Sequence, residues 1–524
     1  MTRAGAALVF ALTVASCARP GAQTQPHVLR IADNVDPTSL NPLLAHDQVT
    51  IGNDLLVTET LVGLSAENRL VPVLVTRVPS LANGDVSHDG RTIVYHLRRG
   101  VRFADGKELT SGDVAFTFHA ILDPRNPVES QDAYRRIAAL LTPDRYTVVV
   151  RLRRRWNAAV AELFAQADFA FGILPAHAFA STDVGKAVWN ERPFGTGPFR
   201  VVAWERASRI VLEPNPYYRP RPKLRRIVFV LMPSTEASLL ALRSRDVDVA
   251  AIDSQQMPEA RGAAGAHVVI TPVNGAYFLF AQTSRGPTAD LHVRRAIAAA
   301  LDRRAIGRGA FGALMPADSF LPPVFGWHDP SPASAQGNAA TVARELIAAG
   351  WTNNSGRWIK RGKPLAVSIA LAPERGTWTE VLEQEQLSRA GIEVALKPYA
   401  AALFNAPGGP LRTGSFTLAA GWWIGAADPE QSVIFACSQR GPDGNNSMNY
   451  CSGRFDALFE DQAVTANPAR RRDDFVAMQR IVRNDVPVVP VAFLSNVDVV
   501  ADRVSGFRRN MLMYPVGAES WDAR

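Results

Sequence analysis

Residues 87–118 read SHDGRTIVYHLRRGVRFADGKELTSGDVAFTF, and this stretch decides the class of fold. Asp89-Gly90 and Asp105-Gly106 are turn signals, and apolar residues alternate along one strand face after the first turn: Ile93, Tyr95 and Leu97. A helix is expected to begin at Thr110, because Asp113 completes an approximate capping box three residues later. A hairpin that leads directly into an amphipathic helix predicts a mixed α and β fold.

The rest of the chain continues this mixture. Apolar alternation and short apolar runs predict strands at 27–32, 146–152, 200–204, 227–232, 276–280, 365–371, 392–397 and 486–493. Helical spacing predicts helices at 52–64, 235–244, 290–306, 341–349, 378–389, 454–464 and 470–483, with Asp290 as an N-cap. Because 524 residues exceed one ordinary hydrophobic core, we expect an α/β or α+β fold in more than one lobe.

The first residues indicate export. Arg3 precedes a short apolar run, Ala4 to Val14, which has the length of a signal-peptide core and is too short to span a bilayer. The run ends in Val14-Ala15-Ser16-Cys17, which resembles the lipobox of bacterial lipoproteins. We therefore predict a lipoprotein signal peptide at 1–16, a lipid on Cys17 and a flexible tether at 17–27. The alternative is an ordinary secretory signal with an incidental cysteine.

Two further cysteines, Cys437 and Cys451, flank a polar loop rich in turn-forming residues. In an oxidising compartment they are expected to form a disulfide, whose loop of about 15 residues gives roughly 3 kcal/mol in the chain-entropy model. Two free buried thiols are the alternative. The net charge of +8 is spread over scattered clusters such as Arg151 to Arg155, so we expect solvated surface and no nucleic-acid binding.

The sequence contains none of the common hydrolase signatures. It has no GxSxG elbow, no HExxH helix and no SxxK followed by KTG. The nine histidines are dispersed, and no histidine or cysteine has the spacing of a metal ligand. We therefore predict a protein that is not an enzyme, with no catalytic residue, no metal site and no cofactor.

A second informative stretch is GWWIGAADP at 421–429. On a strand Trp422 and Trp423 face opposite sides, so one of them at most is simple core. Gly425 allows a close approach of another backbone or a ligand, and the carboxylate of Asp428 precedes a proline. The stretch is either a wall of a binding site or a buried strand end with one partly exposed indole.

Four stretches together resemble the peptide, opine and nickel-binding family of ABC-transporter solute-binding proteins. In chain order they are residues 71–118, residues 193–250 from PFGTGPFRVVAWE to LLALRSRDVDVA, residues 292–306 (HVRRAIAAALDRRAI), and residues 421–493 from GWWIGAADP to NDVPVVPVAF. The resemblance covers most of the mature chain, and the first stretch is the most specific.

The resemblance implies a two-lobed periplasmic-binding-protein fold of α/β class, with a ligand cleft between the lobes. Lobe I is expected at 28–272 plus 493–524, with an extra subdomain at 59–188, and lobe II at 273–492. It also implies an extracytoplasmic protein on the periplasmic side, which hands a small-molecule or peptide ligand to ABC permease subunits and is expected to be a monomer. The expected ligand-binding residues are Trp422, which matches the family's tryptophan, and Trp423, Gly425, Asp428 and Tyr277.

The chain departs from the peptide-binding members at one informative position. Those members carry an Asp-Tyr pair whose carboxylate holds the free α-amino group of the peptide, and here the pair is replaced by Gly425 and Ala426. A buried ammonium without a counter-charge is costly, so a simple peptide held by its N-terminus is not expected. A sugar, a modified peptide or another polar metabolite remains open, as do a secreted hydrolase on the same scaffold and a ligand sensor that does not import.

Overall fold

The computed structural model describes the chain in the ranges 25–45, 48–128, 131–167, 170–179, 183–329, 336–373, 377–441 and 444–524. The predicted signal peptide 1–16, Cys17 and most of the tether 17–27 lie outside the described residues. Within those ranges, no helix is long and apolar enough to cross a membrane.

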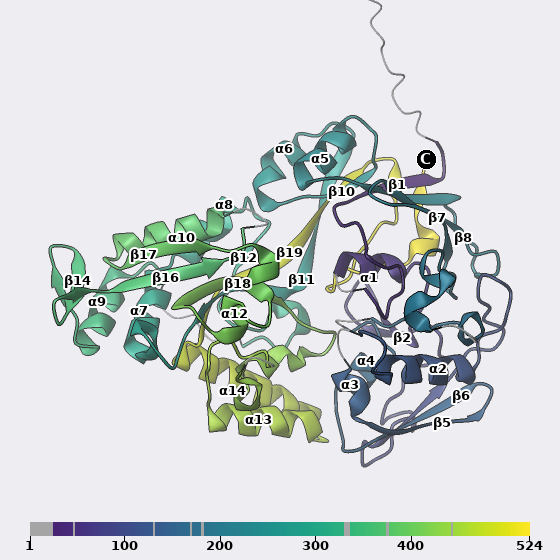
Figure 1. Cartoon of the computed structure of the whole chain (residues 1–524), viewed down its shortest axis with the longest axis horizontal. Helices are drawn as coiled ribbons and strands as arrows, with labels where there is room; N and C mark the ends of the chain where they lie inside the picture. Colours follow the sequence, from purple (N-terminus) through teal and green to yellow (C-terminus); the bar gives the residue numbers. More distant parts are fainter. Residues whose placement is uncertain are drawn as a thin grey trace, which may run out of the picture.

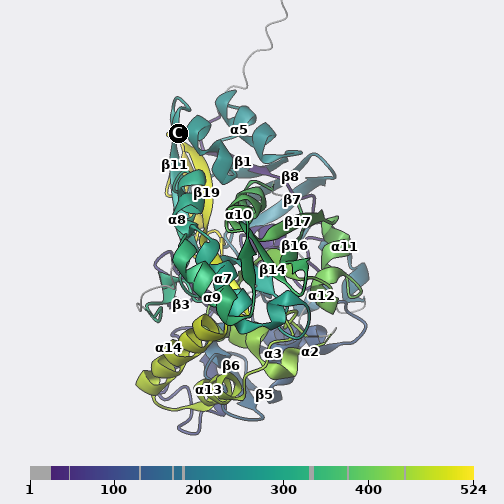
Figure 2. The ribbon, with the colours of Figure 1, turned by 90° about the vertical axis from the view of Figure 1, so that its left-hand side faces the viewer.

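Two lobes of mixed α and β structure lie side by side, which confirms the predicted two-lobed α/β fold. They are joined by two long strands, β11 (Ala266–Ala281) and β19 (Val488–Ala501), which run from one lobe into the other (Figure 1). The view turned by 90° shows the same two strands adjacent along their length (Figure 2). The link between the lobes is therefore a hydrogen-bonded ribbon of two strands.

One sheet of 11 strands passes through both lobes in the order β17-β16-β18-β11-β19-β10-β1-β9-β8-β7, and β12 also pairs with β19. The strands are β1 Val28–Asp33, β7 Phe199–Glu205, β8 Arg209–Pro214, β9 Arg226–Leu231, β10 Val249–Ala251, β12 Met315–Pro316, β16 Ala366–Leu371, β17 Glu393–Pro398 and β18 Leu418–Ile424. The ribbon stands in the middle, so lobe II lies on its β18 side and lobe I on its β10 side.

The ladder between β11 and β19 is interrupted near its middle. Pro272 is opposite Ser495, and the next aligned residue, Ala276, is opposite Phe493. Three residues of β11 therefore face a single residue of β19, which weakens the ladder at this point. The predicted lobe boundaries at 272/273 and 492/493 fall at the same place and remain a prediction.

A buried carboxylate in lobe I binds two arginines from distant parts of the chain. Asp248, which directly precedes β10, accepts hydrogen bonds from Arg30 of β1 at 2.8–3.1 Å and from Arg503 at 2.8 and 3.0 Å. Asp248 is buried, and both guanidinium groups reach it from neighbouring segments of the chain. A buried charge is tolerated when it is paired in this way, so the triad joins the start, middle and end of the chain.

The predicted extra subdomain has a core of its own, with buried residues from Leu43 to Trp189. It contains a small sheet of β4 (Thr92–His96), β6 (Thr147–Leu152) and β5 (Ile137–Asp144), together with α2 (Ser111–Leu122). The capping box of Thr110 and Asp113 begins α2 as predicted. The turns at Asp89-Gly90 and Asp105-Gly106 are confirmed, although the main partner of β4 is the distant strand β6.

Lobe II packs helices on both faces of its sheet. One core includes residues of α7 (Leu291–Ala300) and α9 (Ala339–Ala348), together with Leu387 of α10 (Trp378–Arg389). The other core includes residues of α13 (Gly453–Val464) and α14 (Pro468–Asp485). Alternate residues of β11 enter the two cores, since Leu279 belongs to the first and Phe278 and Phe280 belong to the second.

Two of the predicted helices are wrong in extent. The segment 52–64 contains only the end of α1 (Gln48–Asp54), and Val62–Leu64 forms β2 because it pairs with β3 (Leu70–Pro72). The segment 290–306 is two helices, since α7 ends at Ala300 and Asp302 caps a second helix, α8 (Arg303–Gly309). In the first segment strand pairing with β3 replaces the helix that the apolar spacing predicts. In the second segment the N-cap at Asp302 divides that helix in two.

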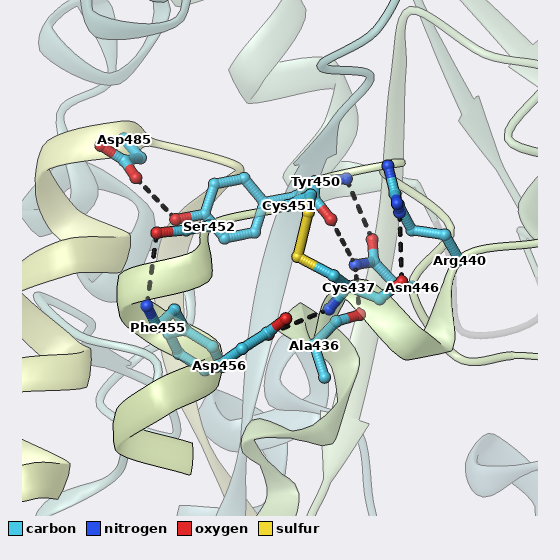
Figure 3. The surroundings of a disulfide bond; sticks show 10 residues. All are labelled: Ala436, Cys437, Arg440, Asn446, Tyr450, Cys451, Ser452, Phe455, Asp456 and Asp485. Atoms are coloured by element: carbon cyan, nitrogen blue, oxygen red, sulfur yellow. Dashed lines mark hydrogen bonds between the residues drawn. A yellow bond between two sulfur atoms is a disulfide. The ribbon is translucent and has the colours of Figure 1, made fainter. Parts of the chain in front are cut away.

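Cys437 and Cys451 form a disulfide with a Cα–Cα distance of 4.6 Å (Figure 3). The loop that the disulfide closes is also held by Asn446, whose side chain donates to the carbonyls of Ala436 and Tyr450. The Tyr450 hydroxyl donates to Asp485 at the end of α14, and the backbone N–H of Cys437 donates to Asp456 of α13. The disulfide therefore fastens this polar loop against the two late helices of lobe II.

Candidate functional site

The end of β18 lies beside the interrupted part of the ribbon. Trp422 is opposite Tyr277 of β11, Trp423 is opposite Ala276, and Ile424 is opposite Gly275. A side chain on Gly275 would come within 2.9 Å of the Trp423 carbonyl oxygen and 3.0 Å of Leu494. The glycine therefore lets three strands approach closely at the point where the lobes meet.

The two tryptophans have different surroundings. Trp422 is on the face of Tyr277, and 44% of its surface is exposed. Trp423 is on the opposite face, where it packs against the core shared with α14, and its indole nitrogen is buried. Trp422 is thus the more exposed of the two indoles, and Trp423 is mainly part of the lobe II core.

Asn274 connects three segments at the break in the ladder. Its backbone N–H donates to the Met511 carbonyl at 2.8 Å, and its own carbonyl accepts from the backbone N–H of Gly425 at 2.8 Å. Its side-chain amide donates to the Ala426 carbonyl at 2.6 Å. One buried asparagine therefore links the ribbon to the segment after β18 and to the end of lobe I. Gly425 itself is buried in this arrangement.

Asp428 is not available to a ligand. Its two carboxylate oxygens accept hydrogen bonds from the two terminal nitrogens of Arg471 at 2.9 and 2.7 Å, and it is only 7% exposed. The guanidinium of Arg471 also stacks over the rings of Trp327 and Phe475. A bidentate, desolvated pair of this kind fixes both partners, so Asp428 positions the segment after β18 and does not replace the missing carboxylate at position 425.

Tyr277 faces two buried glutamates of α10. Its hydroxyl donates to Glu380 at 3.0 Å, and Glu383 lies one helical turn further on, beside the same hydroxyl. Glu383 is fully buried, and neither of its oxygens has a hydrogen-bond partner among the described residues. Burial raises the pKa of Glu383 well above its ordinary value, and the charge of Glu380 raises it further. Burial also raises the pKa of Glu380. Burial behind Tyr277 therefore favours the protonated form of Glu383.

The lobes touch at two further places. Val324, Phe325 and Ala427 of lobe II pack against a buried lobe I cluster that contains Ile51 and Tyr514. In the extra subdomain, Asn157 exchanges backbone and side-chain hydrogen bonds of 2.8 Å with the carbonyls at the end of α13, which are those of Gln462, Ala463 and Thr465. The two lobes are thus in contact at both places.

Residues 76–444 match the family described as bacterial extracellular solute-binding proteins, family 5. The chain belongs to this family. It is a solute-binding protein that captures a ligand outside the cytoplasm and delivers it to an ABC importer, as the sequence predicted.

Known relatives cover nearly the whole chain. The oligopeptide-binding protein AppA of Bacillus subtilis is 22% identical over 93% of this chain and 90% of its own length. Heme-binding protein A of Haemophilus influenzae is 26% identical over 83% of this chain and 82% of its own length. The crystal structure of NikA from Brucella suis in complex with Fe(III)-EDTA superposes with a TM-score of 0.84 at 21% identity, over 95% of this chain and all of NikA.

Sequence reasoning named the strand end but missed its polar supports. It named Trp422, Trp423, Gly425, Asp428 and Tyr277, which the structure brings to neighbouring positions on β11 and β18 and in the segment that follows. The supports that it missed are Asn274, Arg471, Glu380 and Glu383. A sequence signal existed for Glu383 alone, because it occupies an inward position of α10, four residues before the buried Leu387.

The protonation of Glu383 makes the stability of lobe II depend on pH. Between the ordinary carboxyl pKa of 4.5 and the raised pKa, the folded protein holds a proton that the unfolded chain releases, so stability falls as pH rises above 4.5. We expect the stability of the Glu383→Gln variant to fall less than that of the wild type as pH rises. Its melting temperature should exceed that of the wild type by at least about 2 °C at pH 8, and this gain should shrink at pH 5.

The exposed Glu385 of the same helix supplies the control, because it pairs with Arg389 on the surface. Glu385→Gln should leave the pH profile of the melting temperature unchanged. An identical profile for Glu383→Gln and the wild type in calorimetry would show that Glu383 is ionised in the folded protein.

Proposed function

We propose that the protein is a lipid-anchored monomer at the outer face of a bacterial membrane that closes its lobes on a small polar ligand and presents this ligand to the permease subunits of its importer. The observation that carries the proposal is the exposed Trp422 at the end of β18, beside the break in the ribbon that joins the lobes. Rotation at a break in the ladder opens and closes the space beside this tryptophan.

In this proposal the residues at the strand end have separate roles. The Trp422 indole stacks on an apolar or planar part of the ligand, which contributes on the order of 1–3 kcal/mol when it is buried. Gly425 leaves room for the ligand backbone, and Tyr277 with Glu380 forms the polar wall on the Trp422 face. Trp423 and the Asp428–Arg471 pair hold the strand end in place.

The proposed ligand is not anchored through a free α-amino group. Relatives named for oligopeptides and for heme show that this scaffold serves ligands of different chemistry. At the position where the peptide-binding members have an aspartate, this chain has Gly425, and the neighbouring Asp428 is neutralised by Arg471. An uncharged or blocked ligand such as a sugar or a modified peptide therefore fits this part of the site better than an ammonium group.

The Gly425 argument predicts a gain of function. Gly425→Asp should strengthen the binding of di- to pentapeptides with a free amino terminus by at least about tenfold, because it restores a carboxylate beside the strand end. Gly425→Asn has the same size without the charge and should bring no gain. Isothermal calorimetry against a peptide library measures both variants. Tight wild-type binding of free-amine peptides that Asp428→Asn leaves unchanged would refute the argument.

The role of Trp422 predicts a loss of affinity without a loss of fold. The ligand is first identified by mass spectrometry of protein purified in its native state. Trp422→Ala should then weaken binding at least about tenfold, or 1.4 kcal/mol, and wild-type fluorescence should be quenched or shifted on binding. Trp351→Ala is the control, since this half-buried indole lies under Lys360 elsewhere in lobe II. Equal affinity of the Trp422→Ala protein and the wild type would remove Trp422 from the site.

The lipid anchor predicts a change in partitioning. Cys17→Ser should move the protein from the membrane fraction to the soluble fraction, because the acylated side chain is lost. Ser16→Ala keeps a small residue before the cysteine and should remain in the membrane fraction. Immunoblots after detergent phase separation distinguish the two, and a Cys17→Ser protein that still partitions with detergent would exclude the anchor.

A further inference from the structure

A small cavity lies inside lobe II, away from the end of β18. It is bounded by α8, α14 and the start of β19, and its volume is about 20 Å³. The polar side chains that line it belong to Arg303, Asp318, Ser319, Gln479 and Arg483. A cavity needs about 10–15 Å³ to hold one water molecule, so this cavity holds one water or one monatomic ion and excludes sulfate or a carboxylate.

Among the side chains that line this cavity, Arg303 is unusual because its charge is buried without a hydrogen bond to any described residue. It is 2% exposed and makes no hydrogen bond or ion pair with any residue that the structure describes. Its nearest opposite charge is Asp318, and burial lowers the pKa of Arg303 to about 10, which leaves it protonated at neutral pH. Buried charges are normally paired or hydrogen-bonded. A guanidinium in this position therefore indicates an acceptor inside the cavity.

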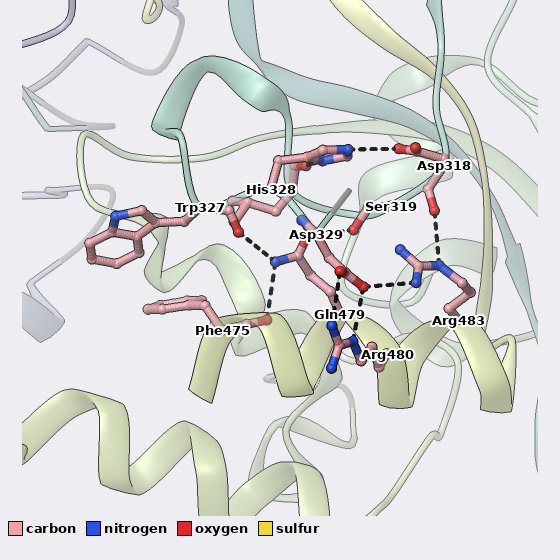
Figure 4. A network of polar contacts seen from close by, with 10 residues as sticks. Asp318, Ser319, Trp327, His328, Asp329, Phe475, Gln479, Arg480 and Arg483 are labelled. Atoms are coloured by element: carbon pink, nitrogen blue, oxygen red, sulfur yellow. Dashed lines mark hydrogen bonds and ion pairs between the residues drawn. The ribbon is translucent and has the colours of Figure 1, made fainter. Parts of the chain in front are cut away.

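Two carboxylates lie near the cavity (Figure 4), and Oδ1 of Asp318 is buried without a hydrogen-bond partner among the described residues. Asp318 lies 3.1 Å from Nε2 of His328, and this contact raises the pKa of His328. Asp329 accepts from Arg483 at 2.8 Å and from Arg480 at 3.3 Å. Asp329 is thus shared by Arg480 and Arg483, Asp318 pairs with His328, and Arg303 has no carboxylate of its own. The terminal nitrogen of Arg483 that does not reach Asp329 is buried without a partner among the described residues.

The amide of Gln479 adds no negative charge to balance this surplus. Its oxygen accepts from the Ser319 hydroxyl and the backbone N–H of Asp329, and its nitrogen donates to the carbonyls of Trp327 and Phe475. The amide of Gln479 therefore has no free acceptor for the arginines. The buried N–H groups of Arg303 Nε and of one terminal nitrogen of Arg483 remain without an acceptor among the described residues.

We propose that this cavity binds one monovalent anion of the size of chloride, held between the guanidinium groups of Arg303 and Arg483. A single water molecule has the right size and accepts from these donors, but it leaves the surplus positive charge buried. An anion satisfies the donors and balances the charge, and the contact of His328 with Asp318 at 3.1 Å reduces the repulsion from that carboxylate.

The anion has a structural consequence for the segment 317–329. This segment carries Asp318, Ser319 and Asp329 at its ends, and its tip, Val324 and Phe325, packs against lobe I. Arg483, one of the two arginines that bind the anion, also holds both ends of the segment to α14. The site therefore stabilises the part of lobe II that contacts lobe I.

The test compares chloride with gluconate at constant ionic strength, using the full mature protein in differential scanning calorimetry. Chloride should raise the melting temperature in a saturable manner, by about 3–8 °C between 1 and 300 mM. Arg303→Met should abolish this rise. Arg304→Met, which removes the exposed neighbouring charge, should keep it.

Crystals soaked in bromide supply a readout that does not require a folded variant. An anomalous peak between Arg303 and Arg483 is expected. A melting temperature that does not distinguish chloride from gluconate, or a cavity that holds an ordered water only and no bromide, would overturn the proposal. An equal chloride response in the Arg303→Met and wild-type proteins would do the same.

Discussion

The antiparallel pairing of β11 with β19 places one continuous ribbon in both lobes, and this shared ribbon constrains how the lobes can move. Hydrogen bonds along the ribbon keep the lobes in register, so large displacements must occur where the ladder is weakest. That point is the interval from Pro272 to Ala276, where three residues oppose one. The backbone N–H and carbonyl of Asn274 bond there to Met511 and Gly425, so these two groups stay satisfied without a ladder partner.

The candidate binding site follows from the same constraint. β18 pairs with β11 up to Gly275, so the end of β18 necessarily lies at the break in the ladder. Residues after β18 are then placed by two polar contacts, from Asn274 to the backbone and from Arg471 to Asp428. Because Asp428 is used for this purpose, the loss of a carboxylate at position 425 is not repaired nearby.

Local signals in the sequence predicted much of the fold. The capping box at Thr110, the turn at Asp89-Gly90 and the helix at 378–389 are all where the residues placed them, because each depends on neighbours in the chain. The helix expected at 290–306 failed because Asp302 begins a second helix, and a cap signal at that residue was readable but outweighed by the apolar period. The supports of the site were not predictable in the same way. Asn274, Glu383 and Arg471 act on partners far away in the chain, and one sequence does not pair them.

Buried charged groups are balanced in three different ways in this protein. In lobe I the carboxylate of Asp248 accepts from two arginines, so its burial is balanced by its partners. In lobe II, Glu383 and Arg303 are both buried, and neither has a partner among the described residues. A carboxylate can remove its charge by taking a proton, and the raised pKa of Glu383 reflects this. An arginine cannot release its proton at neutral pH, so its charge must be balanced by another ion. The two unpaired groups therefore impose different requirements on lobe II, a proton for one and an anion for the other.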